Sequence, residues 1–461
     1  MNNIKEYISQ NKERILNELF GLIRIPTVSG SADHVDDMQK AAIYLKENLL
    51  NSGADKVEIY QTEGAPIVYG EKKINESLQT VMIYGHYDVM PAGNKPGSTE
   101  GWDSPPFEPE IRNEKIYARG ADDDKGQVFI QLKAFEYLAK TNQLNCNVKF
   151  ILEGEEETGS DSIAVFCNQY KEMLKADIIL VSDTGIIAQD TPSITVGLRG
   201  IAYMQVEVQG PNHDLHSGIY GGAVANPANV LTKMIAALFD ENNHIAIPGF
   251  YDDVLVISHE ERVEMAKAPY DEQKYCEALG IKSTYGEKGY STLERTGIRP
   301  SLDINGIWSG FTQEGTKTVL PEKASAKISM RLVPNQQPDK IAKLFEDFLL
   351  SIAPKGVTVK VKYLHGGEPY VAPSEMIAYR AASKAYEKTF NKIPVPTRSG
   401  GSIPIISLFE KVLGTKSILM GFGLESDAIH APNENFSLFN LFIGIETIAW
   451  FYQYYAEEMN K

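Results

Sequence analysis

The sequence predicts an α/β fold in which an α+β domain is inserted into a discontinuous domain with a wound, largely parallel sheet. Amphipathic helices alternate with short apolar strands up to residue 196, which is typical of parallel sheets. Apolar and polar residues alternate in the insert, residues 197–372, as in half-exposed strands. Helical spacing and a buried strand resume afterwards, so residues 1–196 and 373–461 are expected to form the larger domain.

The elements of the first segment are separated by glycine and proline. Helical apolar spacing runs from Ile4 to Ile23 and is broken at Pro26. A second helix is expected from about Val35 to Asn51, with Gly53 after its end. The other elements expected here are strands at 56–60, 67–69, 80–84, 115–118, 148–152 and 178–181 and helices at 127–139 and 162–174.

The insert and the C-terminal segment contain longer elements. Val206 and Val208 alternate with polar neighbours in a half-exposed strand. Residues 245–300, rich in charge and tyrosine, give no readable pattern. The remaining expected elements are helices at 227–239, 339–351, 375–388 and 438–459 and strands at 323–332, 357–363 and 417–420.

Composition narrows the class of protein. The 461-residue chain is 43% hydrophobic and 23% charged, which is ordinary for a soluble globular protein. Its net charge of −16 argues against nucleic acid and anionic membrane surfaces as partners. The three cysteines are widely spaced and form no CxxC pair, and the N-terminal stretch lacks a signal-peptide core. A cytoplasmic location is therefore expected, with any metal site filled inside the cell.

A loop of acidic residues follows one apolar strand. Glu155, Glu156 and Glu157 are consecutive within Glu153–Ser160, directly after the run that ends at Leu152. Adjacent like charges repel, and a bound cation would offset that repulsion. Solvation of an ordinary surface loop is the alternative explanation.

His86 and Asp88 follow the strand at 80–84. Because they stand two residues apart, both side chains project to the same side of an extended segment. This spacing suits a metal ligand whose second ring nitrogen is held by a carboxylate. A loop histidine with a chance neighbour is the alternative.

Other acids and a histidine complete a possible ligand set. Asp122, Asp123 and Asp124 precede a helix, Asp183 follows a strand, and His430 lies in a polar segment. Strand ends meet at the ligand-binding edge of an open α/β sheet, so these segments can converge. One or two histidines with four carboxylates suit paired Zn²⁺ or Mn²⁺. Helix capping would also explain single aspartates here.

Eight short motifs occur in a fixed order along the chain. They are His86-Tyr87-Asp88, Arg119 to Gly126, Glu153 to Ser160, Ser182-Asp183, Asp214 to Gly218, Met330 to Pro334, Gly400 to Pro404 and His430 to Glu434. This order resembles that of the M20 metallopeptidase family, and within it the cytosolic nonspecific dipeptidases and carnosinase-like enzymes. The resemblance covers nearly the whole chain, and the order of eight motifs makes it far more specific than any one motif.

The resemblance implies two divalent metal ions per subunit, Zn²⁺ in the first place and Mn²⁺ as the alternative. Asp123 would bridge them. His86 and Asp183 would complete one site, and Glu157 and His430 the other. Family members hold the bridging aspartate through a non-proline cis peptide, so one is expected between Asp123 and Asp124.

The implied chemistry is hydrolysis. Two cations roughly 3.5–4 Å apart lower the pKa of a shared water and polarise the scissile carbonyl, making hydroxide available. Glu156 would be the general base that passes the water proton to the leaving amine, typically a contribution of about 10²–10⁴-fold. Asp88 would orient His86 and so take part in catalysis.

Residues of the insert are expected to serve a partner subunit. The resemblance implies that His216 reaches the partner's site and stabilises the oxyanion of the tetrahedral intermediate. Thr318 resembles a second residue supplied in the same way. The insert would then be both a lid and the interface of a homodimer. An ordinary His-Ser-Gly turn is the alternative for His216.

A further group of residues is expected to hold the substrate. Arg331 suits the terminal carboxylate, since a guanidinium binds carboxylates in a fork geometry. Gly401 and Ser402 would offer backbone N–H groups to the same carboxylate at the start of a helix. His365 resembles another residue on the substrate side. A surface charge for Arg331 and a glycine turn with a serine cap are the alternatives.

One position departs from the family pattern and leaves the substrate open. Ser399 stands where the dipeptidases carry the glutamate that would hold a free substrate amine. The expected activity is hydrolysis of dipeptides or short peptides with a free C-terminal carboxylate. An N-acyl amino acid deacylase on the same scaffold is the nearest alternative, and a non-catalytic metal-binding protein a remote one. Retention of Glu156 beside the full ligand set argues against the latter.

Overall fold

The computed structural model describes residues 3–93, 97–266, 268–373, 375–400 and 403–461. Contacts divide the chain into two compact units. The first unit contains residues 1–196, 372–397 and 408–461, and the second contains residues 197–371 and 398–407. Among the helices of the described ranges, none has the length and apolar character needed to cross a bilayer.

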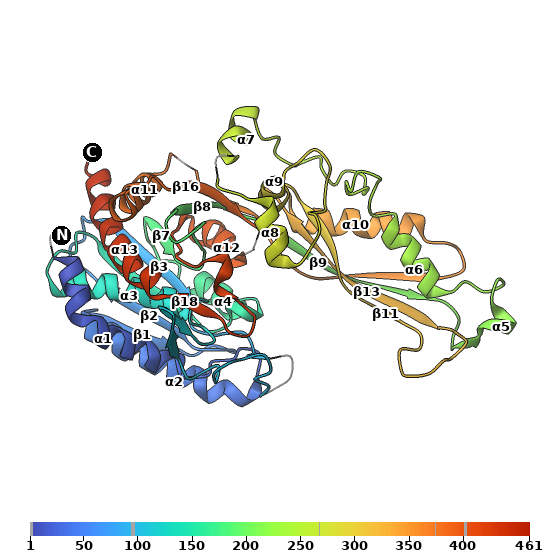
Figure 1. Ribbon diagram of the computed structural model, residues 1–461, viewed down its shortest axis with the longest axis horizontal. Helices are drawn as coiled ribbons and strands as arrows, with labels where there is room; N and C mark the ends of the chain where they lie inside the picture. The colour runs from blue at the N-terminus through green and yellow to red at the C-terminus, as the bar shows by residue number, and fades with distance from the viewer. Residues whose placement is uncertain (1–2, 94–96, 267, 374, 401–402) are drawn as a thin grey trace. The chain divides into compact units, whose positions relative to one another are not determined.

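A large mixed sheet forms the centre of the first unit (Figure 1). Its strand order is β1-β2-β6-β3-β7-β17-β8-β15, and β16 pairs with β8. The central pairs of β3 with β6 and β7, and of β7 with β17, are parallel as expected, whereas the outer pairs are antiparallel. The strands are β1 (Lys56–Tyr60), β2 (Ile67–Lys72), β3 (Thr80–His86), β6 (Asn147–Glu153), β7 (Ile178–Val181), β8 (Ser193–Leu198), β15 (Tyr370–Val371), β16 (Val395–Ser399) and β17 (Ser417–Leu419).

Helices cover both faces of this sheet. The alternation along β3 separates the faces, because Val81 and Ile83 join the main core whereas Tyr84 packs edge-on against Phe409 at 5.1 Å between ring centroids. The helices on the main-core side are α1 (Ile4–Ile23), α2 (Val35–Ser52), α3 (Lys125–Lys140), α11 (Ile377–Phe390) and α13 (Leu438–Met459). The helices α4 (Asp161–Gln169) and α12 (Pro404–Leu413) supply aromatic residues to the other side.

A small sheet and short helical turns lie beside this core. The three-stranded sheet has the order β18-β5-β4, with β4 at Glu110–Arg112, β5 at Lys115–Tyr117 and β18 at Asn435–Ser437. The 3₁₀ turns of this unit are η1 (Ala32–His34), η2 (Glu156–Thr158) and η3 (Glu425–Asp427). The loop ahead of β18 and the turn η2 carry candidate metal ligands.

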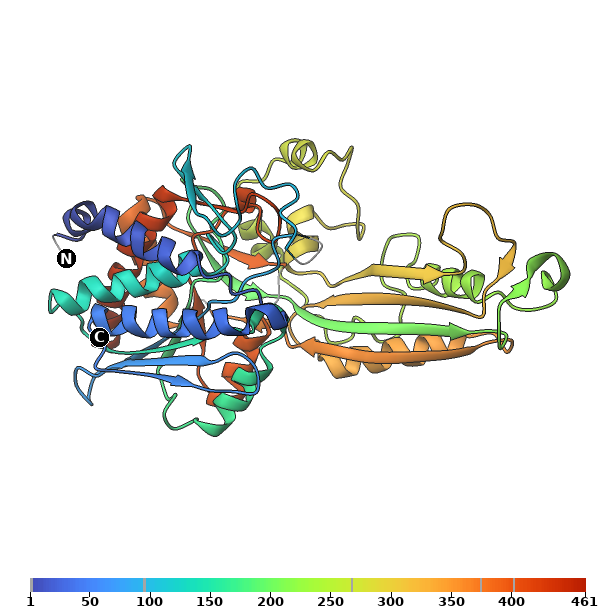
Figure 2. The same ribbon diagram turned by 90° about the horizontal axis from the view of Figure 1, so that it is seen from below.

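The second unit is an antiparallel sheet with helices on one face (Figure 2). Its order is β11-β13-β9-β14, with β9 at Gly200–Gln209, β11 at Ser301–Ser309, β13 at Lys323–Leu332 and β14 at Thr358–Gly367. Buried residues alternate with half-buried ones along β9, as expected for a half-exposed strand. The buried set packs on α6 (Pro227–Ala236) and α10 (Pro338–Ile352).

In the stretch 245–300, where no pattern could be read from the sequence, the described residues form three helices. They are α7 (His259–Met265), α8 (Glu272–Leu279) and α9 (Thr292–Gly297). Ser291 and Glu294 form a capping box at the start of α9, and Arg262 pairs with Glu294. Arg299 binds Glu287 through two hydrogen bonds of 2.8 and 2.7 Å. Charged pairs therefore hold this stretch together where a long apolar repeat is missing.

Candidate metal centre

The five predicted metal ligands lie at a strand end, in a short 3₁₀ turn and in loops of the first unit. His86 is the last residue of β3, Glu157 lies in η2 after β6, and Asp183 follows β7. Because β3 pairs in parallel with both β6 and β7, these three loops leave the same edge of the sheet. Asp123 immediately precedes the N-cap of α3, and His430 comes from the loop before β18.

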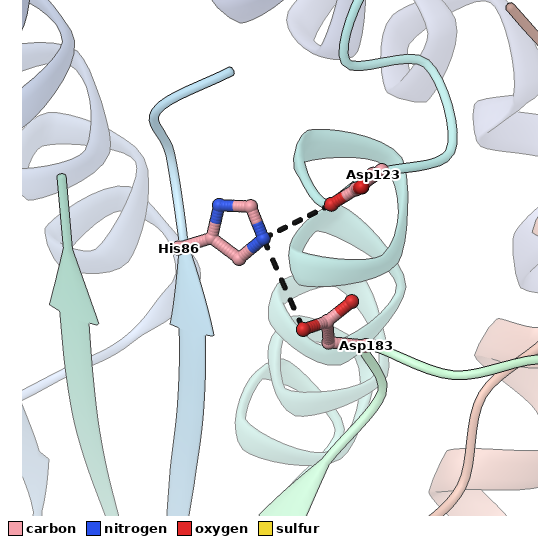
Figure 3. A group of neighbouring side chains, drawn as sticks. All are labelled: His86, Asp123 and Asp183. Carbon is pink, nitrogen blue, oxygen red and sulfur yellow. Dashed lines mark ion pairs between the residues drawn. The ribbon is translucent and has the colours of Figure 1, made fainter. Parts of the chain in front are cut away.

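His86, Asp123 and Asp183 form one group of candidate ligands. Their side chains point toward one another from the end of β3, the start of α3 and the loop after β7 (Figure 3). Nε2 of His86 lies 3.0 Å from Oδ1 of Asp123 and 4.0 Å from Oδ2 of Asp183. One metal ion fits the common space that these atoms face.

Asp123, Glu157 and His430 form the second group. Nε2 of His430 lies 3.0 Å from Oδ2 of Asp123 and 3.1 Å from Oε2 of Glu157. The two oxygens of Asp123 therefore face two different histidines. Within each group all ligand atoms lie within 4.8 Å of one another. A carboxylate shared in this way has the arrangement of a bridging ligand.

The ring nitrogens of His86 test whether a cation fits. Nδ1 is engaged with Asp88, 3.2 Å from Oδ1 and 3.1 Å from the backbone oxygen. Nε2 is fully buried and makes no hydrogen bond, although an oxygen of Asp123 lies 3.0 Å away. Assigning the proton to Nδ1 leaves a lone pair on Nε2 that points with the carboxylate oxygens into one space. These donors fit a divalent metal ion.

Asp88 connects the two halves of the site. Besides facing His86, its carboxylate accepts the backbone N–H of Glu156 at 3.2 Å and that of Glu157 at 3.1 Å. Asp88 is completely buried. A carboxylate in this position fixes the orientation of the imidazole and the path of the acidic loop together.

The pKa values at the site reflect burial and the close approach of acids and histidines. Burial, with the charge of Asp123, raises the pKa of Asp183 to about 7. Hydrogen bonds that the His430 imidazole donates to the carboxylates of Asp123 and Glu157 raise the pKa of His430 to about 10. Burial lowers the pKa of His86, but contacts with Asp123 and Asp88 outweigh it, so that the pKa is raised well above its ordinary value. A bound cation would take the place of these protons.

The three consecutive glutamates have three different surroundings. Oε2 of Glu155 accepts the backbone N–H of Ser162 at 3.2 Å, in the first turn of α4. Glu157 faces His430. Glu156 stands beside both ligand groups, and burial, with the nearby charges of Asp183 and Asp123, raises its carboxyl pKa well above the ordinary value. A raised pKa is what a proton-accepting group working near neutral pH needs.

The expected cis peptide between Asp123 and Asp124 is present. Asp124 is the N-cap residue of α3, yet its side chain makes no capping hydrogen bond. It accepts instead the backbone N–H of His86 at 3.1 Å. Helix capping therefore does not explain the aspartates ahead of α3.

Two buried acids near the site were given no role from the sequence. Glu434, four residues after His430 in the same motif, accepts hydrogen bonds from the loop that carries Asp123. Glu153, at the end of β6, accepts the hydroxyls of Tyr84 and Ser160. Their places in the motifs Glu153 to Ser160 and His430 to Glu434 were the available signal, because contacts with residues far along the chain leave no periodic pattern.

The expected residues of the insert lie in the second unit. His216 ends β10 (Leu215–His216), which pairs with β12 (Val319–Leu320) directly after Thr318. Both side chains are exposed. Nδ1 of His216 accepts the backbone N–H of Gly218 at 3.0 Å, so the neutral ring carries its proton on Nε2.

Arg331 and His365 lie near one end of the four-stranded sheet. Arg331 is half-buried and pairs in register with Ile201 of β9. His365 pairs with Tyr203, and the two rings are stacked with centroids 5.2 Å apart. Gly401 and Ser402, also expected to bind substrate, lie outside the described residues.

These two pairs of residues are separated by the length of β9. The opposite end of that strand, Gln209, pairs with Lys323 near the β10–β12 corner, and α5 (Ser217–Tyr220) continues from there (Figure 1). At about 3.3 Å per residue, the span from Tyr203 to Gln209 is roughly 20 Å. Arg331 therefore lies near one end of the four-stranded sheet, and His216 lies beyond the other end, in the separate β10–β12 pair.

Comparison with known families identifies the chain's class. The sequence profile of Peptidase family M20/M25/M40 matches residues 82–453. The chain belongs to this peptidase family. The resemblance to M20 metallopeptidases that the eight motifs carry is thereby confirmed, and so is the prediction that the chain is an enzyme.

Relatives of the M20 chain span most of its length. A Cys-Gly metallodipeptidase of Candida albicans is 31% identical over 472 residues, which cover 98% of this chain and 96% of the relative. The human Beta-Ala-His dipeptidase is 31% identical over 393 residues, covering 84% and 77%. Both relatives are named as dipeptidases.

A solved structure supports the fold of the M20 chain. The metallo-carboxypeptidase Sso-CP2 of Sulfolobus solfataricus superposes with a TM-score of 0.86 at 31% identity, covering 96% of this chain and 99% of that one. The predicted α/β fold class is confirmed, with the mixed sheet described above.

Proposed function

We propose that this chain is a di-metal dipeptidase that hydrolyses dipeptides or short peptides with a free C-terminal carboxylate. The two ligand groups that share Asp123 carry the proposal, because each of its oxygens faces a different histidine. The names of the two dipeptidase relatives support the substrate class. Zn²⁺ is the proposed metal and Mn²⁺ the alternative, since imidazole and carboxylate ligands suit both.

Five residues would hold the metals, two histidines and three acids. Asp123 would bridge them, His86 and Asp183 would bind one, and Glu157 and His430 the other. When bound, such a pair supplies a water of lowered pKa and polarises the scissile carbonyl.

Glu156 would move the proton. Its carboxylate accepts a proton from the attacking water and donates it to the nitrogen of the leaving amine. Its buried position beside both ligand groups, which raises its carboxyl pKa, supports this role. Asp88 would act as a positioning residue, keeping the Nδ1–H of His86 and the backbone of Glu156 in a fixed relation.

The second unit would bind the substrate and stabilise the reaction. Arg331 is proposed to bind the terminal carboxylate together with the loop of Gly401 and Ser402, with His365 nearby. The Nε2–H of His216 is available as a donor to an oxyanion because Nδ1 already accepts a backbone hydrogen bond. Thr318 borders the same corner.

A homodimer through the second unit follows from the distances within it. His216 and Thr318 lie beyond the end of β9 that is remote from Arg331, too far to meet the same substrate in one chain. In a dimer the partner would supply them. Apolar side chains exposed around this end support an interface, namely Ile219, Tyr220, Ile307, Trp308 and Phe311.

A reducing, cytoplasmic location fits the sulfur chemistry of the chain. All three cysteines, Cys146, Cys167 and Cys276, are buried free thiols. Unpaired buried thiols are typical of proteins kept in a reducing compartment.

The proposal is tested by a substrate panel with Zn²⁺ or Mn²⁺. We expect chelator-sensitive hydrolysis of free dipeptides and loss of turnover when the C-terminal carboxylate is amidated. Faster cleavage of the N-acetylated dipeptide would identify a deacylase instead. Preference for long peptides would identify a carboxypeptidase, as the solved relative is named. Absence of any product with both metals would leave only a metal-binding protein.

A further inference from the structure

The carboxylate of Glu434 lies where the loops of the metal centre meet. Glu434 is completely buried and lies on the same loop as His430. Its Oε1 accepts the backbone N–H of Asp122 at 3.1 Å and that of Asp123 at 3.2 Å. Its Oε2 accepts the backbone N–H of Gly120 at 3.1 Å. Three N–H groups of the loop that carries the bridging aspartate thus converge on one carboxylate from the histidine loop.

Arg119 neutralises this carboxylate and extends the connection. Its Nη1 donates to Oε2 of Glu434 at 2.7 Å, and its Nη2 donates to the backbone oxygen of Pro91 at 3.2 Å. Pro91 lies on the loop that leaves β3 after His86. The guanidinium is buried as well, with 1% of its residue surface exposed. The pair therefore joins the loops that follow His86, precede Asp123 and follow His430.

The chemistry at this position is specific for a carboxylate. Four donors approach its two oxygens, and both oxygens are used. A glutamine side chain would place its NH₂ group against donors on one side, because an amide has only one acceptor oxygen. Breaking a buried charge pair by removing one partner also leaves the other charge without compensation. The backbone conformation around Asp123 thus depends on an acid far along the chain, because the hydrogen bond between Asp123 and Glu434 spans 311 residues.

We propose that Glu434 is a positioning residue of the metal centre. It fixes the backbone of residues 120–123 against the His430 loop, so that the two oxygens of Asp123 face both histidines at once. Metal binding and turnover therefore depend on Glu434 although it is not itself a ligand. This inference rests on the proposed function for turnover, whereas its effect on metal affinity stands independently.

The test is the Glu434→Gln variant of the full chain, measured by Co²⁺ titration with visible absorption and by metal content after dialysis. We expect metal affinity to fall by about 10–100-fold, the usual loss when a group that orients ligands is removed. We also expect an altered Co²⁺ spectrum and a larger change in kcat than in KM. A folded Glu434→Gln protein with wild-type Co²⁺ affinity and spectrum would overturn the proposal.

Glu136→Gln is the matched control. Glu136 is equally buried, paired with basic side chains and located in the same unit, but on α3 about 16 Å along the helix from Lys125. We expect this variant to lose stability and to keep the Co²⁺ spectrum. If Glu136→Gln changed Co²⁺ affinity as much as Glu434→Gln, the effect would be general destabilisation and the proposal would fail.

A second variant covers the case in which Glu434→Gln does not fold. Arg119→Lys keeps the positive charge but has one nitrogen in place of the two that reach Glu434 and Pro91. We expect a smaller loss of Co²⁺ affinity in the same direction, and an unchanged affinity would count against the proposal. If wild type binds two metals but hydrolyses no peptide, the proposed function fails while the Co²⁺ comparison still decides the role of Glu434.

Discussion

Two clusters of buried charged residues in the first unit both contain acids, but the residues that pair with those acids differ. Around Glu136 of α3, the carboxylate accepts from Arg14 at 2.6 Å, from Lys133 at 2.7 Å and from Lys140 at 3.0 Å. At the metal centre, the ion pairs of Asp123 among the described residues run to imidazoles only. Among the described residues, lysine and arginine pair with Glu136, whereas only histidines pair with Asp123.

The pKa directions follow this difference. Burial opposes ionisation of Glu136, but Lys133 and Arg14 outweigh it and lower its pKa. At the metal centre, burial raises the pKa of both Asp183 and Glu156, and the neighbouring acids add to it. A buried group of acids without lysine or arginine therefore indicates a place for a cation from outside, whereas a neutralised group indicates a structural role.

The largest effect is expected from Asp123→Asn. The substitution removes the negative charge that faces both histidines, so metal affinity should fall by more than the roughly 10–100-fold typical of outer partners, and peptidase activity should be lost. Metal analysis with circular dichroism as a folding control checks it. A folded variant that retains both metals would contradict the assignment of Asp123 as their shared ligand.

The next effect is expected from Glu156→Gln. This side chain belongs to neither ligand group, so both metals should remain while turnover falls by about 10²–10⁴-fold, the usual contribution of a general acid–base group. Metal content and kcat measured on one preparation separate the two properties. Loss of a metal from this variant would assign Glu156 to the ligand set instead.

Glu136→Gln is expected to act on stability alone. Removing one partner from a buried charge pair typically costs about 3–5 kcal/mol, and metal content per folded chain should not change. The lowered pKa of Glu136 determines how its contribution to the free energy of unfolding changes with pH. Its contribution is present above the unfolded value of 4.5 and is lost as the pH falls toward the folded value. Urea unfolding at several pH values should show wild type and variant converging in acid.

The smallest effect is expected from Glu153→Gln, an intermediate case. Tyr84 donates to Glu153 at 2.6 Å and Ser160 donates at 2.9 Å, but no lysine or arginine of the described residues forms an ion pair with it, and burial raises its pKa to about 8. The folded chain then binds the proton more tightly than the unfolded chain, so this group costs stability as the pH rises from 4.5 to 8. The difference in unfolding free energy between variant and wild type should shift in favour of the glutamine over that window.

The contrast between the clusters also explains what the sequence could predict. His86, Glu157 and Asp183 follow apolar strands, and strands with their end points can be recognised from residue patterns. Glu136 looks like any exposed helical glutamate in sequence, and its burial depends on how α1 packs on α3. Glu434 binds backbone groups of a distant loop, for which the residue types carry no signal.

The insert also contains features that residue patterns could not predict. The helices of 245–300 are held by pairs such as Arg299 with Glu287, which an apolar repeat does not reveal. The separation of His216 from Arg331 became visible only with the register of β9 and β13. The order of the motifs predicted which residues to consider, and the pairing of the strands showed how far apart His216 and Arg331 lie.

The ten-residue strand β9 sets the distance between two candidate functional residues of the second unit. Its length separates His216, the candidate oxyanion donor, from Arg331, the candidate carboxylate binder, within one chain. If both residues serve one reaction, each chain contributes residues to two active sites, and neither site is complete without the partner chain. Turnover would be a property of the assembled pair, and an isolated chain, however well folded and metallated, would be an incomplete catalyst.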